Sequence, residues 1–401
     1  MRKSFQMLKR ATAVLCSVAV VLSTVGCGGN QGKATGGHDV TTGRWREKEE
    51  TTFESVVSEE IAEESVSEVT TEESIFFEET SQMNTEQQTT TVDITEGNGT
   101  PYGTHGRLSV SGTRLVDQYG NSYSLKGVST HGISWYPQYV SYDTFKELRD
   151  TWGANVVRIA LYTAEYNGYC SGGNKEELKA LVKKGIDAAT ELGLYVIVDW
   201  HILTDTNPWQ NKEEAVKFFS EISEQYKSYD NVIYEICNEP NGGTTWADIK
   251  SYAMEVIPVI RANDSDAIII VGTPNWSQDV EQASYDKITG YDNVMYALHF
   301  YAATHKQWLR DKAQIAINNG CPLFVSEFSI CDASGNGALD INEANMWLDF
   351  LDDNGISYVG WNLSNKEEAS ALFQSWCSKI SGFEQSELSE WAKWLKLAIQ
   401  E

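Results

Sequence analysis

Short apolar runs alternate with amphipathic segments from about residue 106 to the end of the chain. Several of these runs are almost continuously apolar, as expected of parallel strands that are buried on both faces. The segments between them place apolar residues at helical spacing, as in Leu178, Val182, Ile186 and Ala189. The alternation predicts strands at residues 125–129, 155–160, 194–199, 232–237, 267–271, 294–299, 322–327 and 356–361.

The ends of the intervening helices are also marked in the sequence. Asn174 and Asn211 each stand three residues before a glutamate, which is the spacing of a capping box at the start of a helix. Gly193, Gly320 and Gly355 each follow a predicted helix, at the position where a left-handed residue usually ends one. A last helix is expected from residue 386 onward.

Strand–helix units repeated eight times in about 290 residues favour a closed barrel over an open doubly wound sheet. No GxGxxG or GxxxxGK[ST] motif follows any predicted strand, so the nucleotide-binding alternatives lack their phosphate loop. Residues 108–116 and 117–123 predict a small β-hairpin that turns at Gly120 and Asn121. We therefore expect an α/β fold, a (β/α)8 TIM barrel with a short N-terminal β-hairpin, over residues 105–401.

Residues 1–27 have the layout of a secretory signal peptide. Four basic residues among the first ten precede an apolar stretch, 11–25, that is too short to span a membrane comfortably. Thr-Val-Gly-Cys at 24–27 resembles a bacterial lipobox, in which the cysteine is lipidated and becomes the mature terminus; leucine is commoner than threonine at its first position. We expect a secreted protein with a lipid anchor at Cys27 on the outer face of the cell membrane, with plain secretion as the alternative.

Residues 28–104 are rich in Ser, Thr, Glu and Gln and contain few apolar residues. Such a segment cannot bury enough apolar surface to offset the entropy of ordering its backbone. We expect a disordered acidic linker that holds the folded domain away from the cell surface. The linker carries about half of the formal net charge of −26. This acidic balance makes nucleic acid an unsuitable partner.

The chain has seven cysteines, two of them in the targeting region. The other five form neither a CxxC motif nor a Cys/His metal pattern, and their odd number leaves at least one free thiol. Cys237 lies within an apolar run and is interpreted as a small buried hydrophobic residue. The five are Cys170, Cys237, Cys321, Cys331 and Cys377.

Two glutamates stand at the ends of predicted strands. Glu239 follows the strand at 232–237 in the triplet Asn-Glu-Pro, and Glu327 ends the strand at 322–327. In a barrel all carboxyl ends of the strands meet at one face, where the chemistry of this fold takes place. One such glutamate alone would equally suit a helix cap or a salt bridge. Two carboxyl groups brought together are the minimal equipment for cleaving a glycosidic bond.

The other strand ends are rich in polar and aromatic residues. His131, His201 and His299 could in principle hold a metal, but they lie on three strands without an HxxxH motif, and hydrogen bonding to a sugar suits them better. No sequence feature argues for a metal or another cofactor. Tryptophan rings stack well on pyranose faces, so tryptophans in loops and at strand ends would suit sugar subsites. These are Trp135, Trp276 and Trp361, whereas Trp152, Trp391 and Trp394 lie on helical segments and are assigned to outer packing.

Together these residues resemble the bacterial endo-β-1,4-glucanases, the cellulases of glycoside hydrolase family 5. The resemblance spans essentially the whole predicted domain from about residue 107 and none of the linker. It rests on several short motifs in the same order: KGVSTHG at 126–132, DWH at 199–201, IYEICNEP at 233–240, WSQDV at 276–280, YALHFY at 296–301, SEF at 326–328 and WNLS at 361–364.

The resemblance implies a retaining double displacement, with Glu239 as general acid/base and Glu327 as nucleophile. It further implies that Asn238 binds the 2-hydroxyl group at the cleavage subsite. Arg158 and Tyr301 would keep Glu327 ionised and oriented. The remaining residues would contact the sugar or the catalytic pair: His131, Trp135, His201, Trp276, His299, Trp361 and Lys366.

The implied partner is a β-glucan polysaccharide. The sequence carries no signal for oligomeric state, and a monomer is taken as the default. One departure from the family pattern is Phe328-Ser329 after the nucleophile, where many relatives have Trp-Gly; the loss of the indole N–H puts one hydrogen bond there in question.

Two alternatives stay open. The same machinery could act on β-mannan, mixed-linkage glucan or xyloglucan, because loop shape decides the polymer and is poorly read from sequence. A catalytically inactive, surface-tethered glycan-binding lipoprotein is a second alternative, but it would have no need to keep both glutamates together with Asn238 and Arg158.

Overall fold

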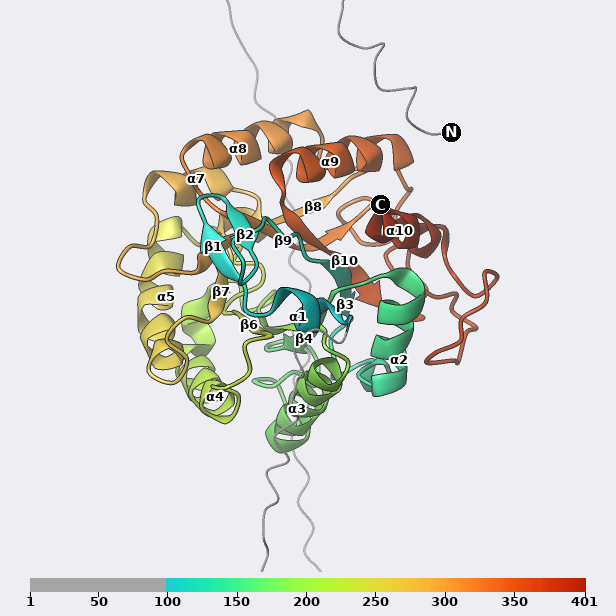
Figure 1. Cartoon of the computed structure of the whole chain (residues 1–401), viewed down its shortest axis with the longest axis horizontal. Coiled ribbons are helices and arrows are strands. Elements are labelled where there is room, and N and C mark those ends of the chain that lie inside the picture. Colours follow the sequence, from blue (N-terminus) through green and yellow to red (C-terminus); the bar gives the residue numbers. More distant parts are fainter. Residues whose placement is uncertain (1–98) are drawn as a thin grey trace, which may run out of the picture. The chain divides into compact units, whose positions relative to one another are not determined.

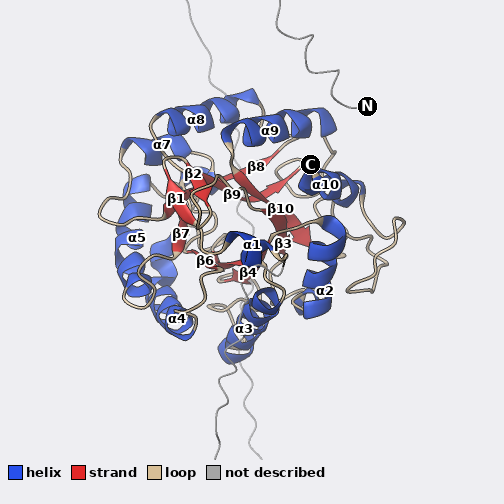
Figure 2. Cartoon of the chain, viewed as in Figure 1, coloured by secondary structure: helices blue, strands red, loops and turns tan. Residues whose placement is uncertain are grey.

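The computed structural model describes residues 99–401. Within them, parallel strands close into an eight-stranded barrel in the order β10-β3-β4-β5-β6-β7-β8-β9. The helices surround the barrel as an outer ring, as Figure 1 and Figure 2 show. The predicted (β/α)8 barrel is therefore confirmed. The barrel strands are β3 Lys126–Thr130, β4 Val156–Tyr162, β5 Tyr195–His201, β6 Val232–Glu235, β7 Ile268–Val271, β8 Val294–Tyr301, β9 Leu323–Ser329 and β10 Ser357–Leu363.

The outer helices follow the strands one after another. They are α2 Tyr142–Glu147, α3 Lys175–Glu191, α4 Lys212–Gln225, α5 Trp246–Arg261, α6 Pro274–Ser277, α7 Val280–Tyr285, α8 Gln307–Asn318, α9 Ile341–Asn354 and α10 Glu390–Gln400. Single turns of 3₁₀ or π helix at Pro137–Tyr139, Leu148–Trp152 and Pro208–Asn211 complete the set. None of the helices in residues 99–401 has the length and apolar character needed to cross a bilayer.

Most helix signals in the sequence are confirmed. The side chain of Asn174 accepts hydrogen bonds from the backbone N–H groups of residues 176 and 177, as a helix cap does. Gly193, Gly320 and Gly355 have φ of 65°, 69° and 64°, in the left-handed region expected of them. Asn211 precedes α4 but does not cap it, because its amide donates to Asp205 Oδ2 instead (3.1 Å).

The hairpin turn and the start of the last helix differ from the sequence prediction. The hairpin of β1 Ser109–Ser111 and β2 Arg114–Val116 turns at Gly112 rather than at Gly120. The turn at Gly120 is a second one, which returns Ser122 to a single bridge with Val116. The last helix starts at 390, because the Ser389 side chain caps it.

The folded unit also begins earlier than the predicted boundary at residue 105. Helix α1, Pro101–His105, occupies what was expected to be the end of the linker. Its Tyr102 N–H donates to the Gly193 carbonyl (2.8 Å), just before β5. The predicted signal peptide, the predicted lipid anchor at Cys27 and the rest of the predicted linker lie outside the described residues.

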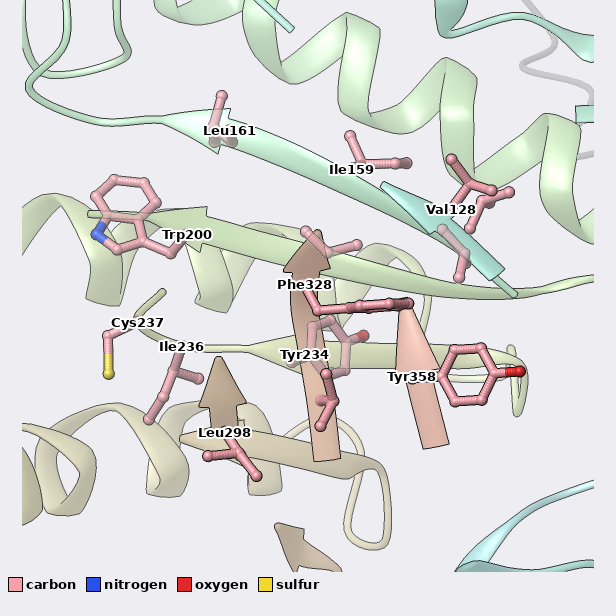
Figure 3. Close-up of a cluster of buried hydrophobic side chains, with 14 of the residues drawn as sticks. Val128, Ile159, Leu161, Trp200, Tyr234, Ile236, Cys237, Leu298, Phe328 and Tyr358 are labelled. Atoms are coloured by element: carbon pink, nitrogen blue, oxygen red, sulfur yellow. The ribbon is translucent and has the colours of Figure 1, made fainter. Parts of the chain in front are cut away.

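Side chains of the barrel strands alternate between the inside and the outside of the barrel. The outward set packs under the helices as a continuous apolar layer (Figure 3), and its members include Val128, Ile159, Leu161, Trp200, Tyr234, Ile236, Leu298, Phe328 and Tyr358. Phe328, the departure from the family pattern, belongs to this layer and packs against Trp391 and Trp394. Cys237 is buried there as predicted, and all five cysteines of the described residues are free thiols.

The inward set is almost entirely apolar at the amino-terminal end of the barrel. Tyr195, Ile197 and Ile233 lie there in one buried cluster with Leu108 and Leu115 from the segment of the hairpin. The hairpin therefore closes this end of the barrel. Farther along the strands the inward residues become polar and charged, and they form the floor of the site described below.

Leu115→Ala should lower the free energy of unfolding by about 2–5 kcal/mol, because it leaves a cavity between hairpin and barrel. Urea denaturation measures this change. Leu397→Ala is the matched control, since the Leu397 side chain on α10 is 63% exposed. A change equal to that of the control would contradict the closing role of the hairpin.

Candidate active site

A cleft of about 530 Å³ lies at the carboxyl ends of the barrel strands. Most of the residues singled out in the sequence line it, as the barrel fold requires. They are His131, His201, Glu239, Trp276, His299, Tyr301, Glu327, Trp361 and Lys366. Arg158 and Asn238 are fully buried beneath the cleft, and Trp135 stands at its edge, 40% exposed.

The two glutamates reach this cleft from different backbone settings. Strand β6 ends at Glu235, earlier than predicted, so Glu239 lies in the following loop, where its N–H donates to the Ile202 carbonyl (3.3 Å). Glu327 lies within β9, which runs two residues past the predicted end. Both side chains are largely buried, and a carboxylate oxygen of one lies within 4.8 Å of one from the other.

A bulge in β9 sets the direction of Glu327. The register with β8 and with β10 shifts between residues 324 and 328 on both sides of the strand. Such an extra residue interrupts the inward–outward alternation. Ser326 and Glu327 consequently both face the inside, whereas Phe328 joins the outer layer.

Glu327 is oriented by two donors. Tyr301 Oη donates to its Oε1 (2.8 Å), and Arg158 Nη1 approaches its Oε2 (3.4 Å). Burial and the nearby Glu239 carboxylate raise the pKa of Glu327, and the positive charges of His299 and Arg158 oppose that rise. With donors on both oxygens, the geometry favours the ionised form of Glu327.

Arg158 is the centre of a buried charge cluster. Its Nε donates to Glu235 Oε2 (2.7 Å), and its Nη2 lies 2.6 Å from Asn238 Oδ1 and 3.0 Å from Asp199 Oδ2. Although burial opposes ionisation, the Arg158 charge and hydrogen bonds lower the pKa of Glu235 to about 2. Burial, with repulsion from Glu235, raises the pKa of Asp199 well above its usual range. The cluster therefore keeps Glu235 ionised beside Arg158.

His299 connects the acid/base candidate to this cluster. Its Nδ1 lies 3.0 Å from Glu239 Oε1, and its Nε2 lies 2.9 Å from Ser326 Oγ. Burial alone would lower the pKa of His299, but interaction with Glu235, Glu239 and Glu327 outweighs burial and raises it to about 9. The His299 ring therefore stays protonated across the neutral range, beside the Glu239 carboxyl group.

His201 is held in the opposite state. Burial, together with the charge of Arg158, lowers the pKa of His201 to about 4, so the ring is neutral near pH 7. Its Nδ1 donates to Asp199 Oδ2 (2.6 Å), which leaves Nε2 to accept from Asn238 Nδ2 (3.2 Å). The Asn238 amide is therefore fixed on both sides, by His201 and by Arg158, directly below the cleft.

Aromatic rings line one part of the cleft. The ring of Trp361 stacks on His201 with centroids 5.1 Å apart and lies 5.3 Å from that of His131. Trp135 stacks on His131 (5.5 Å). Lys366 Nζ lies over Trp135 at 5.7 Å and bonds to Glu368 Oε2 (2.6 Å). Apolar ring faces beside charged donors suit a sugar, which presents C–H faces and hydroxyl edges.

Trp276, in α6, also lines the cleft. Asn275, Trp276 and Ser277 have φ of 58°, 57° and 56°, a left-handed run that is costly for residues with side chains. Backbone bonds hold the run in place: Trp276 N–H donates to the Pro240 carbonyl (3.0 Å). Ser277 Oγ donates to the Asn238 carbonyl (2.7 Å). The indole at the cleft is thus tied to the loop that carries Glu239.

Sequence reasoning missed several residues of the site. Glu235 carries a detectable signal, since it is a charged residue in an apolar strand and shares the inward side with Ile233. Tyr162 also lines the cleft, because β4 runs two residues farther than predicted. Glu368 and His305 line it from loops, and nothing in their surrounding sequence marks them.

Among the described residues, the side chains of Glu239, His299 and Glu327 lie close enough together to hold a metal ion. It is not the three-histidine group weighed from the sequence. Their atoms are already partnered, with His299 on Glu239 and with Tyr301 and Arg158 on Glu327. A pair of carboxyl groups at this separation suits acid–base and nucleophilic chemistry.

A family model described as cellulase (glycosyl hydrolase family 5) matches residues 116–367. The chain belongs to glycosyl hydrolase family 5. It is 50% identical over 294 residues to endoglucanase A of Butyrivibrio fibrisolvens, covering 73% of this chain and 68% of that one. An endoglucanase of Clostridium saccharobutylicum is 50% identical over 295 residues, covering 73% and 65%. The chain thus spans about two thirds of the length of these relatives.

The fold comparison agrees with the family assignment. The catalytic domain of Thermobifida fusca endoglucanase Cel5A is 38% identical, with a TM-score of 0.72, covering 76% of this chain and 100% of that domain. Glycosyl hydrolases typically use paired carboxyl groups, and Glu239 and Glu327 lie close together in the cleft.

Histidine side-chain NMR should separate the two histidines beneath the pair. His299 should keep its second proton up to about pH 9, whereas His201 should stay neutral above about pH 4. Glu239→Gln should lower the pKa of His299, because it removes a negative charge that stabilises the protonated ring. His201 should be little affected by that substitution. Titration of His299 near the ordinary value of 6.5 would contradict the described network.

Proposed function

We propose that this protein is an endo-acting β-1,4-glucanase that cleaves cellulose and related β-glucans with retention of anomeric configuration. The observation that carries the proposal is the short separation of Glu239 and Glu327, with carboxylate oxygens within 4.8 Å. Retaining glycosidases hold their carboxyl groups about 5–5.5 Å apart, whereas inverting ones leave about 6.5–9.5 Å for a water molecule.

In the first step, Glu327 attacks the anomeric carbon while Glu239 gives its proton to the departing glycosidic oxygen. The bond between carbon and that oxygen breaks, and a glycosyl ester on Glu327 forms. In the second step, Glu239 takes a proton from water, whose oxygen attacks the same carbon and releases Glu327. Two inversions give net retention. Tyr301 and Arg158 hold Glu327 in line for both attacks.

The shape of the cleft supports internal cleavage of a polymer. Trp361 from β10 and Trp276 from α6 line the same cleft as the two glutamates, so the cleft offers aromatic faces from two separate elements to successive sugar units. The relatives named above are endoglucanases, and a variant of the Thermobifida fusca domain has been solved in complex with cellotetraose. A β-1,4-glucan is therefore preferred over β-mannan or xyloglucan.

The purified protein should release more reducing ends from carboxymethyl-cellulose than from β-mannan. Glu327→Gln should lower kcat by about 10³-fold or more, because an amide cannot form the glycosyl ester. Proton NMR of early products should show the β-anomer first.

Asp311→Asn on α8 is a suitable control, because the Asp311 carboxylate accepts a hydrogen bond from Gln307 on the same helix and lies outside the cleft. It should hydrolyse the polymer at the unaltered rate. Wild-type activity in Glu327→Gln would refute the role of Glu327, and the α-anomer as first product would refute retention.

We further propose that the protein is secreted and held at the outer face of the cell membrane by a lipid on Cys27. The support is the basic–apolar layout of residues 1–25 and the Thr-Val-Gly-Cys sequence at 24–27. One acyl anchor binds a membrane only reversibly, whereas the two or more chains of a bacterial lipoprotein hold it stably.

Cys27→Ala should move glucanase activity from the membrane fraction to the medium. Fractionation of expressing cells measures the distribution, and Cys16→Ala is the matched control, because Cys16 lies within the apolar stretch. Unchanged partitioning of the Cys27 variant would argue for plain secretion.

A further inference from the structure

Glu235 has contacts that neither catalytic step uses. It is fully buried, and each of its two carboxylate oxygens serves a different half of the site. Oε2 accepts from Arg158 Nε (2.7 Å), on the side of the nucleophile. Oε1 accepts from Ser326 Oγ (2.6 Å), and Ser326 leads through His299 to Glu239, on the side of the acid/base.

The direction of hydrogen bonding along this second arm follows from Glu235. Arg158 keeps Glu235 ionised, so its Oε1 can only accept. An oxygen–oxygen distance of 2.6 Å requires a proton between them, and Ser326 must therefore donate its hydroxyl hydrogen to Glu235. Ser326 is left with lone pairs toward His299, so His299 Nε2 must carry a hydrogen and donate to it.

This direction decides what His299 offers to Glu239. With Nε2 protonated, the neutral ring has its lone pair at Nδ1, which faces Glu239 Oε1 at 3.0 Å. A neutral His299 can then accept a hydrogen bond only from a protonated Glu239. Transfer of that proton to Nδ1 gives the alternative state of the same pair, a charged His299 beside an ionised Glu239. If these hydrogen bonds ran in the opposite direction, neutral His299 would carry its hydrogen on Nδ1. That hydrogen would be donated to Glu239 and would favour an ionised Glu239, which has no proton to give.

We propose that Glu235 and Ser326 are positioning residues that fix the direction of this chain and so keep a transferable proton between His299 and Glu239. The inference rests on the proposed glycosidase function and explains how the acid stays loaded. Titratable and charged groups from several strands face this chain. The facing groups are Arg158 from β4, Asp199 and His201 from β5, Glu239 after β6, Tyr301 from β8 and Glu327 from β9.

Two substrates separate the two arms of Glu235. Cellotetraose has a poor leaving group that needs the proton of Glu239, whereas 2,4-dinitrophenyl β-cellobioside has a leaving group that departs without one. The quantity to compare is kcat/KM, which reports the first step for both substrates.

Ser326→Ala cuts only the arm to His299. Its kcat/KM on cellotetraose should fall about 10–100-fold near pH 8, and the alkaline limb of the pH profile should move down by about one unit. The dinitrophenyl substrate should change less than about threefold. Glu235→Gln disturbs both arms, so it should slow both substrates. Ser329→Ala, which removes another buried serine hydroxyl of β9, should leave both rates and the profile unchanged.

Equal slowing of both substrates by Ser326→Ala, or an unshifted alkaline limb, would overturn the proposal. Should the variants fail to fold, NMR of the wild type decides: a neutral His299 that carries its hydrogen on Nδ1 rather than Nε2 would also overturn it. A wild type that cleaves neither substrate would instead refute the glycosidase function itself.

Discussion

The site is organised around one buried cation. Arg158 has no exposed surface, and its guanidinium contacts Glu235, Asp199, Asn238 and Glu327 from four different segments of the barrel. A charge buried this deeply is tolerated only when partners satisfy its hydrogen bonds. Loss of the guanidinium would leave several carboxylates together in a region without water. The barrel strands can therefore place the catalytic groups closely because Arg158 offsets their mutual repulsion.

The same cluster leaves a useful charge at the cleft. Glu235 is ionised beside Arg158, and Glu327 receives donors on both of its oxygens. Two ionised carboxylates, Glu235 and Glu327, then face a single guanidinium. The excess negative charge lies where a glycosyl transition state develops positive charge, which is where fixed electrostatics contribute most to catalysis.

The sequence was sufficient for the barrel, because nearly continuous apolar strands and capped helices alternate along it. It was also sufficient to predict that Glu239 and Glu327 lie close together, since the strand ends of a barrel share one face. The hairpin turn was misplaced because both Gly112 and Gly120 occur in turns, and sequence alone does not say which one the strands flank. Ser326 could not be found by counting alternate residues back from Glu327, because Glu327 faces inward only through a bulge that involves two neighbouring strands.

That bulge shifts the inward–outward alternation of side chains partway along β9. In a regular strand, adjacent residues are committed to opposite sides, so a nucleophile and its immediate neighbour could not both serve one cavity. The extra residue in β9 lets a proton-relaying serine and the nucleophile share the inside, while Phe328 anchors the next position in the outer core. Point substitutions change the side chain at these positions but do not change which positions of β9 face inward. Deleting one residue from β9 would restore regular alternation and turn either the serine or the glutamate out of the site, so the length of this strand is itself a catalytic constraint.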